Sequence, residues 1–172
     1  MSIDTLAVWH ELVATRNAKG LPALLADEVV FHSPVVHKPQ LGKSITARYL
    51  GAAFQVFFNE TFHYVRELKG ERDAVLEFEL VLDGITVNGV DMIKWNASGK
   101  ITEFKVMLRP LKAVNLIHQK MAAALQIAFA RYRDLQARVC FGAAQPGSAQ
   151  GARALSEGIA AQMRRMILAP AC

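Results

Sequence analysis

The segment EVVFHSPVVHKPQLGKS, residues 28–44, holds two of the five histidines in this 172-residue chain. Imidazoles at such spacing serve two kinds of chemistry, metal coordination and proton transfer. A zinc site requires three or four converging ligands, and no His-x-x-x-His pattern supplements His32 and His37. The Ser33–Pro34 pair between them favours an extended or turning chain, so the two rings need not point the same way. We therefore expect no metal site in this segment and a solvated His37.

Asp91 has the surroundings of a general acid or base. It lies in the segment GVDMIKW, where a strand places Ile93 and Trp95 on the same face because side chains alternate. Both neighbours are apolar, which predicts that this face points into the interior. Burial raises the pKa of a carboxyl towards neutrality and suits it to proton transfer. The competing interpretation is a structural aspartate that accepts a hydrogen bond from a neighbouring side chain.

Several aromatic side chains are predicted to point inwards and to form the wall of a pocket. An aromatic-lined cavity suits a flat, apolar small molecule. The same residues form an ordinary packed core if the interior has no cavity. These candidate ligand-binding residues are Trp9, Tyr49, Phe54, Phe78 and Trp95.

The last predicted strand, KITEFKVMLRP, allows two registers. Its side chains form two alternating sets, and either set can face the interior, since a bulge can mix them. With the second set inside, Arg109 lies in the pocket and balances the charge of Asp91, which makes Arg109 a further candidate for ligand binding. The first set is Thr102, Phe104, Val106 and Leu108, and the second is Glu103, Lys105, Met107 and Arg109.

The chain as a whole has a high content of apolar residues. Hydrophobic residues make up 52% of it, and the mean hydropathy is +0.19. No run of about 18 apolar residues occurs, so no membrane span is predicted. The start lacks a signal-peptide pattern, and Cys140 and Cys172 belong to no ligand motif. We expect a cytoplasmic protein with free thiols that buries its apolar excess in a cavity wall or a subunit interface.

The positive charge is concentrated at the C-terminal end. Residues 1–109 hold 12 Lys and Arg against 13 Asp and Glu, whereas residues 110–172 hold 8 against 2. These basic side chains are scattered and are not interleaved with aromatics, as they are on nucleic-acid-binding surfaces. We therefore expect no nucleic-acid partner.

Hydrophobic periodicity predicts that helices and strands are segregated along the chain, which indicates an α+β fold. A meander of long strands must twist and curl. We expect a cone-shaped, curved antiparallel sheet with the early helices on its concave face. The predicted helices are residues 4–20, 21–28, 44–60, 111–139 and 152–168, and the predicted strands are residues 29–34, 62–70, 74–84, 86–95 and 100–110.

Two segments, LADEVVFHSPVVHKPQLGKSITARYL and GVDMIKWNASGKITEF, resemble the nuclear transport factor 2-like (NTF2-like, cystatin-like) superfamily in its SnoaL-like, polyketide cyclase-like branch. The second carries that family's signature: an acid in a strand, an aromatic four residues on, then Gly-Lys-Ile. The resemblance covers residues 1–115 and leaves residues 116–172 as a helical C-terminal extension. It implies a homodimer through the convex sheet face and a pocket at the wide end of the cone.

The resemblance also implies roles for two residues. Asp91 matches the position where SnoaL-type cyclases carry an acid/base aspartate. His32 ends its strand near the pocket mouth and is expected to be a proton relay or a ligand contact. The alternative for His32 is a packed histidine bonded to the backbone.

The predicted function remains open between two classes. One is a small-molecule pocket enzyme without a cofactor, which cyclises, isomerises or dehydrates an apolar carbonyl compound by proton transfer. The other is a non-catalytic ligand-binding or protein-interaction module. Asp27 precedes the first predicted strand and is expected to be solvated, which argues against the steroid-isomerase arrangement with its early catalytic aspartate.

The C-terminal extension is predicted to dock on a folded surface. The helix over residues 111–139 carries apolar side chains on more than one narrow stripe, so it is unlike a helix that stands alone in water. We expect the extension to pack against its own domain or against the partner subunit of the homodimer. A membrane-surface role is disfavoured, because the last predicted helix has a modest charge and no aromatic anchor.

Overall fold

The structure is a computed structural model that describes the backbone of residues 4–142 and the side chains of residues 4–126. The chain divides into two compact units, Met1–Leu125 and Gln126–Cys172, and each is considered by itself. The boundary predicted after residue 115 falls inside a helix that both units share, so the division into a domain and an extension stays a prediction. The predicted last helix, residues 152–168, lies outside the described residues.

The first unit is built on a curved, unclosed sheet of six strands in the order β2-β1-β6-β5-β4-β3. Neighbouring strands are antiparallel, except that β1 runs parallel to β6. The α+β class predicted from the sequence is therefore confirmed, with one parallel pair added. The strands are β1 (Leu25–His32), β2 (Gln40–Leu41), β3 (His63–Lys69), β4 (Asp73–Leu82), β5 (Ile85–Trp95) and β6 (Ile101–Arg109).

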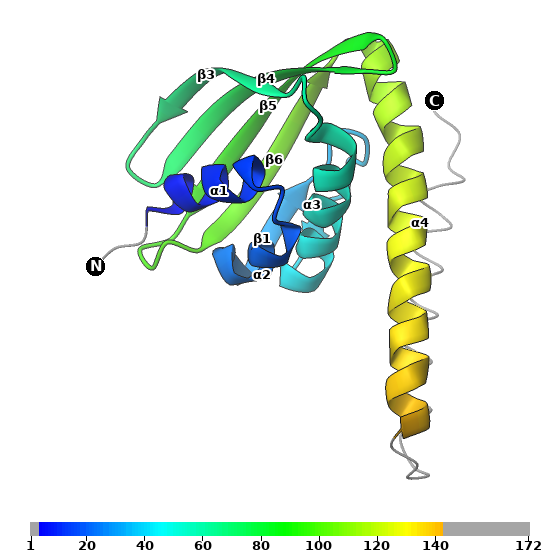
Figure 1. The fold of residues 1–172 in the computed structure, drawn as a ribbon. Helices are drawn as coiled ribbons and strands as arrows, with labels where there is room; N and C mark the ends of the chain where they lie inside the picture. Colours follow the sequence, from blue (N-terminus) through cyan, green and yellow to red (C-terminus); the bar gives the residue numbers. More distant parts are fainter. Residues whose placement is uncertain (1–3, 143–172) are drawn as a thin grey trace. The chain divides into compact units, whose positions relative to one another are not determined.

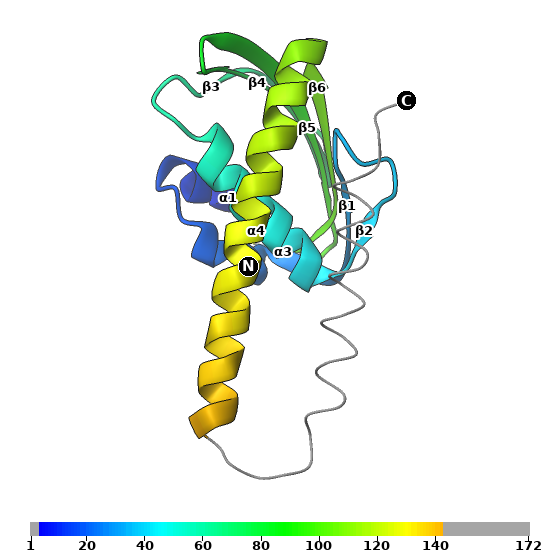
Figure 2. The same ribbon diagram turned by 90° about the vertical axis from the view of Figure 1, so that its right-hand side faces the viewer.

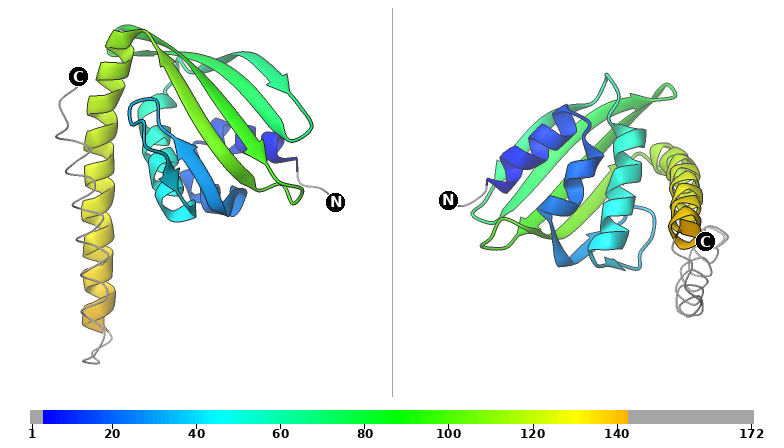
Figure 3. Two further views of the ribbon diagram at one scale, coloured as in Figure 1. Left: turned by 180° about the vertical axis from the view of Figure 1, so that it is seen from behind. Right: turned by 60° about the horizontal axis from the view of Figure 1, so that its bottom comes forward.

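Three helices, α1 (Thr5–Ala14), α2 (Leu21–Leu24) and α3 (Lys43–Phe57), lie on one face of this sheet (Figure 1). Figure 2 shows α1 and α3 on the same side of the strands after a quarter turn. In the view from behind, the strands lie in front of these three helices (Figure 3, left). We call the covered side the helical face and the other side the open face.

Local chemistry fixes where α1 begins and ends. The side chain of Asp4 accepts a hydrogen bond from the Ala7 backbone N–H at 3.2 Å and caps the helix as the sequence predicts. The predicted end at residue 20 is wrong, because α1 stops at Ala14. Arg16 has φ of 51°, a left-handed conformation that an α-helix does not contain. The apolar side of α1 still reaches the core, since Leu6, Trp9, Leu12 and Val13 are buried.

The second predicted helix is half wrong. Residues 21–24 form α2, but residues 25–28 belong to β1. Leu25 pairs with Ile101 of β6, and both side chains are buried. A tertiary pairing therefore overrides the helical reading of LPALLADE.

Alternation along β4 and β5 builds the core on the helical face. Leu76, Phe78 and Leu80 of β4 are buried there. Gly89 of β5 pairs directly with Phe78, and a Cβ atom at Gly89 would lie only 2.7 Å from the Phe78 Cε2 atom. Glycine is therefore required at this position by the close approach of the Phe78 ring.

The fourth helix, α4 (Leu111–Gly142), confirms the long helix predicted from residue 111. Its first turns belong to the first unit, where Ala113, Ile117 and Leu125 are buried. Their apolar neighbours include Phe57 of α3 and side chains of β4 and β5; the cluster is Val56, Phe57, Phe78, Leu80, Val87, Ala113 and Ile117. The start of the extension thus packs on its own domain. No helix in the described part of the chain is both long and apolar enough to cross a membrane.

Candidate functional site

Asp91 occupies the middle of β5 on the helical face. It pairs with Leu76 of β4 on one side and with Val106 of β6 on the other. Only 7% of its surface is exposed. The row Glu67, Leu76, Asp91 and Val106 crosses four neighbouring strands, because Glu67 of β3 pairs with Leu76.

The Asp91 carboxyl has no partner to stabilise a negative charge. Within the described side chains, it takes part in no hydrogen bond and no ion pair. Burial raises its pKa from 3.8 to about 8, since a charge is poorly solvated in the apolar interior. At neutral pH the carboxyl is therefore mostly protonated. The interpretation of Asp91 as a structural acceptor has no donor to support it among the described residues.

Tyr64 of β3 is the second polar group on this part of the helical face. The indole N–H of Trp9 donates a hydrogen bond to the Tyr64 hydroxyl oxygen at 3.1 Å. Burial raises the pKa of Tyr64, and the nearby Asp91 carboxylate raises it further. Because the indole can only donate, the hydroxyl keeps its own proton available for another acceptor.

Trp9 and Tyr64 belong to a ring of five aromatic side chains. Phe54 packs edge-on against Trp9 at 5.8 Å between ring centroids. Phe58 follows at 4.6 Å from Phe54, Phe62 at 4.6 Å from Phe58, and Tyr64 at 5.2 Å from Phe62. The Trp9–Tyr64 hydrogen bond closes the ring. Tyr64 is the member of this ring that lies near Asp91, since the Asp91 carboxylate acts on its pKa.

Trp9 and Phe54 are predicted as wall residues from the sequence, whereas Phe58, Phe62 and Tyr64 are not among those candidates. A signal was present in FFNETFHY, residues 57–64, which has four aromatics in eight positions. Because the chain turns at Asn59, these four aromatic residues follow neither the helical nor the strand periodicity of the sequence. Asn59 bonds to Thr61 and to the Val81 carbonyl, and so turns the chain from α3 into β3.

Two further candidates are buried in the core. Phe78 contacts Phe57 and Phe62, with ring centroids 6.0 Å and 5.4 Å away. Tyr49 of α3 stacks on Phe31 of β1 at 5.4 Å. Both lie on the helical side of the sheet, and their role in ligand binding stays a prediction.

Trp95 lies apart from the other aromatic candidates. The pairing of β5 with β6 shifts between Lys94 and Trp95, and Trp95 is half-buried at the strand end. There it lines an open cleft of about 350 Å³ that does not include Asp91; the lining residues are Asp4, Thr5, Lys69, Glu71, Arg72, Trp95, Asn96, Ala97 and Gly99.

His32 and Arg109 lie on the open face and are not brought to Asp91. His32 pairs with Lys105, and its Nε2 atom is 3.9 Å from the Glu103 carboxylate. Arg109 donates from Nε to Asn88 Oδ1 at 2.7 Å. The pairing of Val106 with Asp91 puts the first set of β6 side chains on the helical face. The register of β6, which the sequence leaves open, is thereby set, and the roles predicted for His32 and Arg109 stay predictions.

Asp27, the early aspartate of the sequence, lies at the surface. Asp27 has 91% of its side chain exposed and forms an ion pair with Lys43 at 2.6 Å. It is part of β1 and does not precede the strand, but it is solvated as expected. Across the described residues, no group of three or more His, Cys, Asp and Glu side chains is placed to hold a metal ion.

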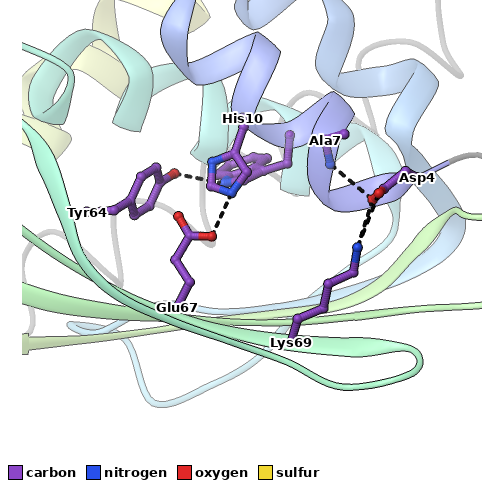
Figure 4. A network of polar contacts seen from close by, with 7 residues as sticks. Asp4, Ala7, His10, Tyr64, Glu67 and Lys69 are labelled. Carbon is purple, nitrogen blue, oxygen red and sulfur yellow. Dashed lines mark hydrogen bonds and ion pairs between the residues drawn. The ribbon is translucent and has the colours of Figure 1, made fainter.

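Polar side chains join α1 to the edge strand β3 beside the aromatic ring (Figure 4). His10 Nε2 lies 3.1 Å from Glu67 Oε2, and Lys69 Nζ lies 3.2 Å from Asp4 Oδ2. The His10 ring also packs edge-on against Tyr64 at 4.9 Å. We call this row of contacts between α1 and β3 the seam.

A family profile and several solved structures are similar to this chain in sequence and in fold. The sequence profile of the SnoaL-like domain matches residues 6–104. A steroid delta-isomerase from Pseudomonas aeruginosa is 36% identical over 76% of this chain and 92% of its own, with a TM-score of 0.64. A conserved bacterial protein with a cystatin-like fold from Silicibacter pomeroyi DSS-3 is 34% identical over 76% of this chain and 93% of its own, with a TM-score of 0.67.

Solved structures of lower sequence identity share only the fold with this chain. An NTF2-like protein from Mesorhizobium loti is 17% identical over 62% of this chain and 89% of its own, with a TM-score of 0.54. None of the curated proteins matches the chain. The resemblance inferred from the two sequence segments is therefore confirmed at the level of family and fold.

Proposed function

This chain belongs to the SnoaL-like domain family, and from that premise we propose that it is a small-molecule pocket enzyme acting by proton transfer on an apolar carbonyl compound. Cyclisation, isomerisation and dehydration are reactions of this kind. The single observation that carries the proposal is Asp91, a buried carboxyl without a partner among the described residues.

The pKa of Asp91, about 8, suits both directions of proton transfer. A group whose pKa lies near the working pH exists in both forms, which is the condition for efficient acid–base catalysis. In its neutral form Asp91 would donate a proton or a hydrogen bond to a carbonyl oxygen. In its ionised form it would accept a proton from the adjacent carbon.

The surroundings of Asp91 support an apolar ligand. The ring of five aromatic side chains offers flat surfaces, and Tyr64 would supply a second hydrogen-bond donor for the carbonyl oxygen. The cationic candidate Arg109 is on the open face, so nothing in the described row around Asp91 favours a carboxylate or a phosphate. The similarity to a protein described as a steroid delta-isomerase supports the same class of ligand.

One observation favours the alternative, a binding module without catalysis. His32, the other residue considered for catalysis, and Arg109, considered for ligand binding, both lie on the open face. A single acid would suffice to orient a ligand through one hydrogen bond. The experiment below therefore measures turnover and binding separately.

Exchange of α-protons tests the proposed chemistry without knowledge of the natural substrate. We expect the protein to accelerate deuterium uptake from D2O into an apolar ketone, for which 1-tetralone and ketones of one to four rings serve as the panel. Asp91→Asn removes the titrating group and should slow the exchange by about a hundredfold or more. Mass spectrometry of the ketone gives the rate.

Asp27→Asn is the matched control, because it makes the same chemical change at a carboxyl that is exposed. It should exchange ketones as fast as the unaltered protein. Exchange that is equally fast in Asp91→Asn contradicts the proposal. Ketone binding that depends on Asp91 without any exchange supports the alternative, a binding module.

We also propose that the open face joins two copies of the chain into a homodimer. Met92, Met107, Val81 and Leu68 are exposed on that face, and apolar side chains amid charges are typical of subunit interfaces. Light scattering at micromolar concentration is expected to give twice the chain mass of 18.9 kDa, and Met107→Glu should lower it. A single chain mass for the unaltered protein contradicts this proposal. The cytoplasmic location stays a prediction.

A further inference from the structure

A ligand that binds at Asp91 has to reach a side chain that is almost fully buried. The helical face is apolar along β4, where Ala74, Leu76 and Phe78 are buried. The residues of β3 that pair with those three are Lys69, Glu67 and Tyr64, which are all polar. At β3 the helical face therefore becomes polar along Glu67 and Lys69, whereas Tyr64 still packs its ring against Phe62.

The seam is held by side chains with considerable solvent access. Asp4 and Lys69 are 56% and 51% exposed, and His10 and Glu67 are 31% and 39% exposed. Exposed ion pairs of this kind contribute little to the stability of a fold. Side-chain rotations at such positions take picoseconds to nanoseconds. The four side chains of the seam can therefore rotate towards solvent on this timescale.

Strand register gives the distance from the seam to Asp91. Glu67, Leu76 and Asp91 stand side by side on three neighbouring strands of the same face. Neighbouring strands are about 4.8 Å apart, so Glu67 is about 10 Å from Asp91 along the sheet. Only Leu76 lies between them in that row. In the part of the chain that the structure describes, β3 is the edge strand next to β4.

We infer that small molecules reach Asp91 through the seam between α1 and β3, and that the His10–Glu67 pair is the gate of this portal. Tyr64 stands at the inner end, because its hydroxyl bonds to Trp9 and its ring contacts His10. A ligand therefore passes the polar pair first and meets the aromatic ring next. This inference rests on the proposed function only in taking Asp91 as the destination.

Cysteine labelling tests the portal without any ligand. The variant Asp91→Cys is made in the full-length chain with Cys140→Ser and Cys172→Ser, so that one thiol remains. N-ethylmaleimide, a small neutral reagent, is the probe, and its rate of reaction reports access to position 91. Adding His10→Ala and Glu67→Ala removes the gate, and we expect labelling to become about tenfold faster or more.

The matched control opens a different ion pair of the same unit. Lys120 of α4 lies 2.8 Å from Asp83. Asp83 is in the turn between β4 and β5, beyond the last pair Leu82–Ile85, whereas Asp91 pairs with Leu76 in the middle of the strands. Lys120→Ala with Asp83→Ala should leave the labelling rate within about twofold. Urea unfolding of every variant measures how much labelling is due to global unfolding.

Faster labelling in the gate variant, at unchanged stability, supports the portal. Equal rates in the gate and control variants overturn it, as does a rise that only follows a loss of stability. These outcomes do not involve the carboxyl chemistry, which is absent from every labelled variant. Failure of the portal is therefore distinguishable from failure of the proposed function, which ketone exchange measures.

Discussion

Ending the chain after Pro110 is expected to unfold or aggregate the protein, whereas ending it after Gln126 should leave the first unit folded. The first turns of α4 bury Ala113, Ile117 and Leu125. Burial of one large aliphatic side chain stabilises a fold by about 1.5–3 kcal/mol. Loss of the two large aliphatic side chains, Ile117 and Leu125, together with exposure of Phe57 and its neighbours, approaches the whole stability of a typical domain, about 5–15 kcal/mol.

A single substitution measures how much the start of α4 stabilises the first unit, without truncation of the chain. Ile117→Ala should lower the free energy of unfolding by about 2–5 kcal/mol, because Ile117 is 1% exposed in the apolar cluster. Leu111→Ala is the matched control on the same helix, since Leu111 is 74% exposed and should cost little. Urea unfolding measures both. A chain ending at Pro110 that stays soluble and equally stable would show that α4 is an independent appendage.

Asp91→Asn is expected to stabilise the protein at pH 8 by several kcal/mol. In the folded chain the pKa of Asp91 is about 8, and its usual value is 3.8. Between these values the folded protein keeps the proton and the unfolded chain loses it. The contribution of Asp91 is therefore fully present below about pH 4 and falls by about 1.4 kcal/mol for each pH unit up to pH 8. Asparagine cannot ionise, so the variant lacks this slope.

The difference between the two proteins isolates this effect from the other carboxyls. Ion pairs and hydrogen bonds lower the pKa values of Asp4 and Asp27, so these groups act on stability below the window in question. Asp27→Asn should therefore run parallel to the unaltered protein between pH 4 and 8. Urea unfolding at a series of pH values supplies the curves. Parallel curves for the unaltered protein and Asp91→Asn would contradict the prediction.

Alternation along one strand is enough to predict the inward face of Asp91. Ile93 is apolar two residues on, and a sheet with one buried face needs every second side chain to be apolar. The same rule predicts β3 to β6 as strands. It depends on sequence-local information only, which explains why these elements are predicted well.

The faces on which His32 and Arg109 lie cannot be predicted from the local sequence. The face of His32 follows from the parallel pairing of β1 with β6, two strands that lie far apart in the sequence. Both alternating sets of β6 contain apolar residues, so periodicity cannot choose the face of Arg109. The pairing of Asp91 with Val106 makes that choice.

The aromatic ring depends on tertiary docking in the same way. Phe58, Phe62 and Tyr64 are close in sequence, but their alignment needs the turn at Asn59. Tyr64 then meets Trp9 only because α1 packs against β3. Neither the sequence of α1 nor that of β3 contains a pattern that predicts this contact.

The most direct test of the role proposed for Asp91 is the titration of its carboxyl group. Carbon-13 NMR of the full-length protein with labelled aspartate follows the side-chain carboxyl resonances with pH, and Asp91→Asn identifies the one that belongs to Asp91. We expect a midpoint near pH 8, because burial without a partner disfavours the charge. A midpoint near the usual value of 3.8 would contradict it, since Asp91 would then be an ionised, solvated or paired carboxylate.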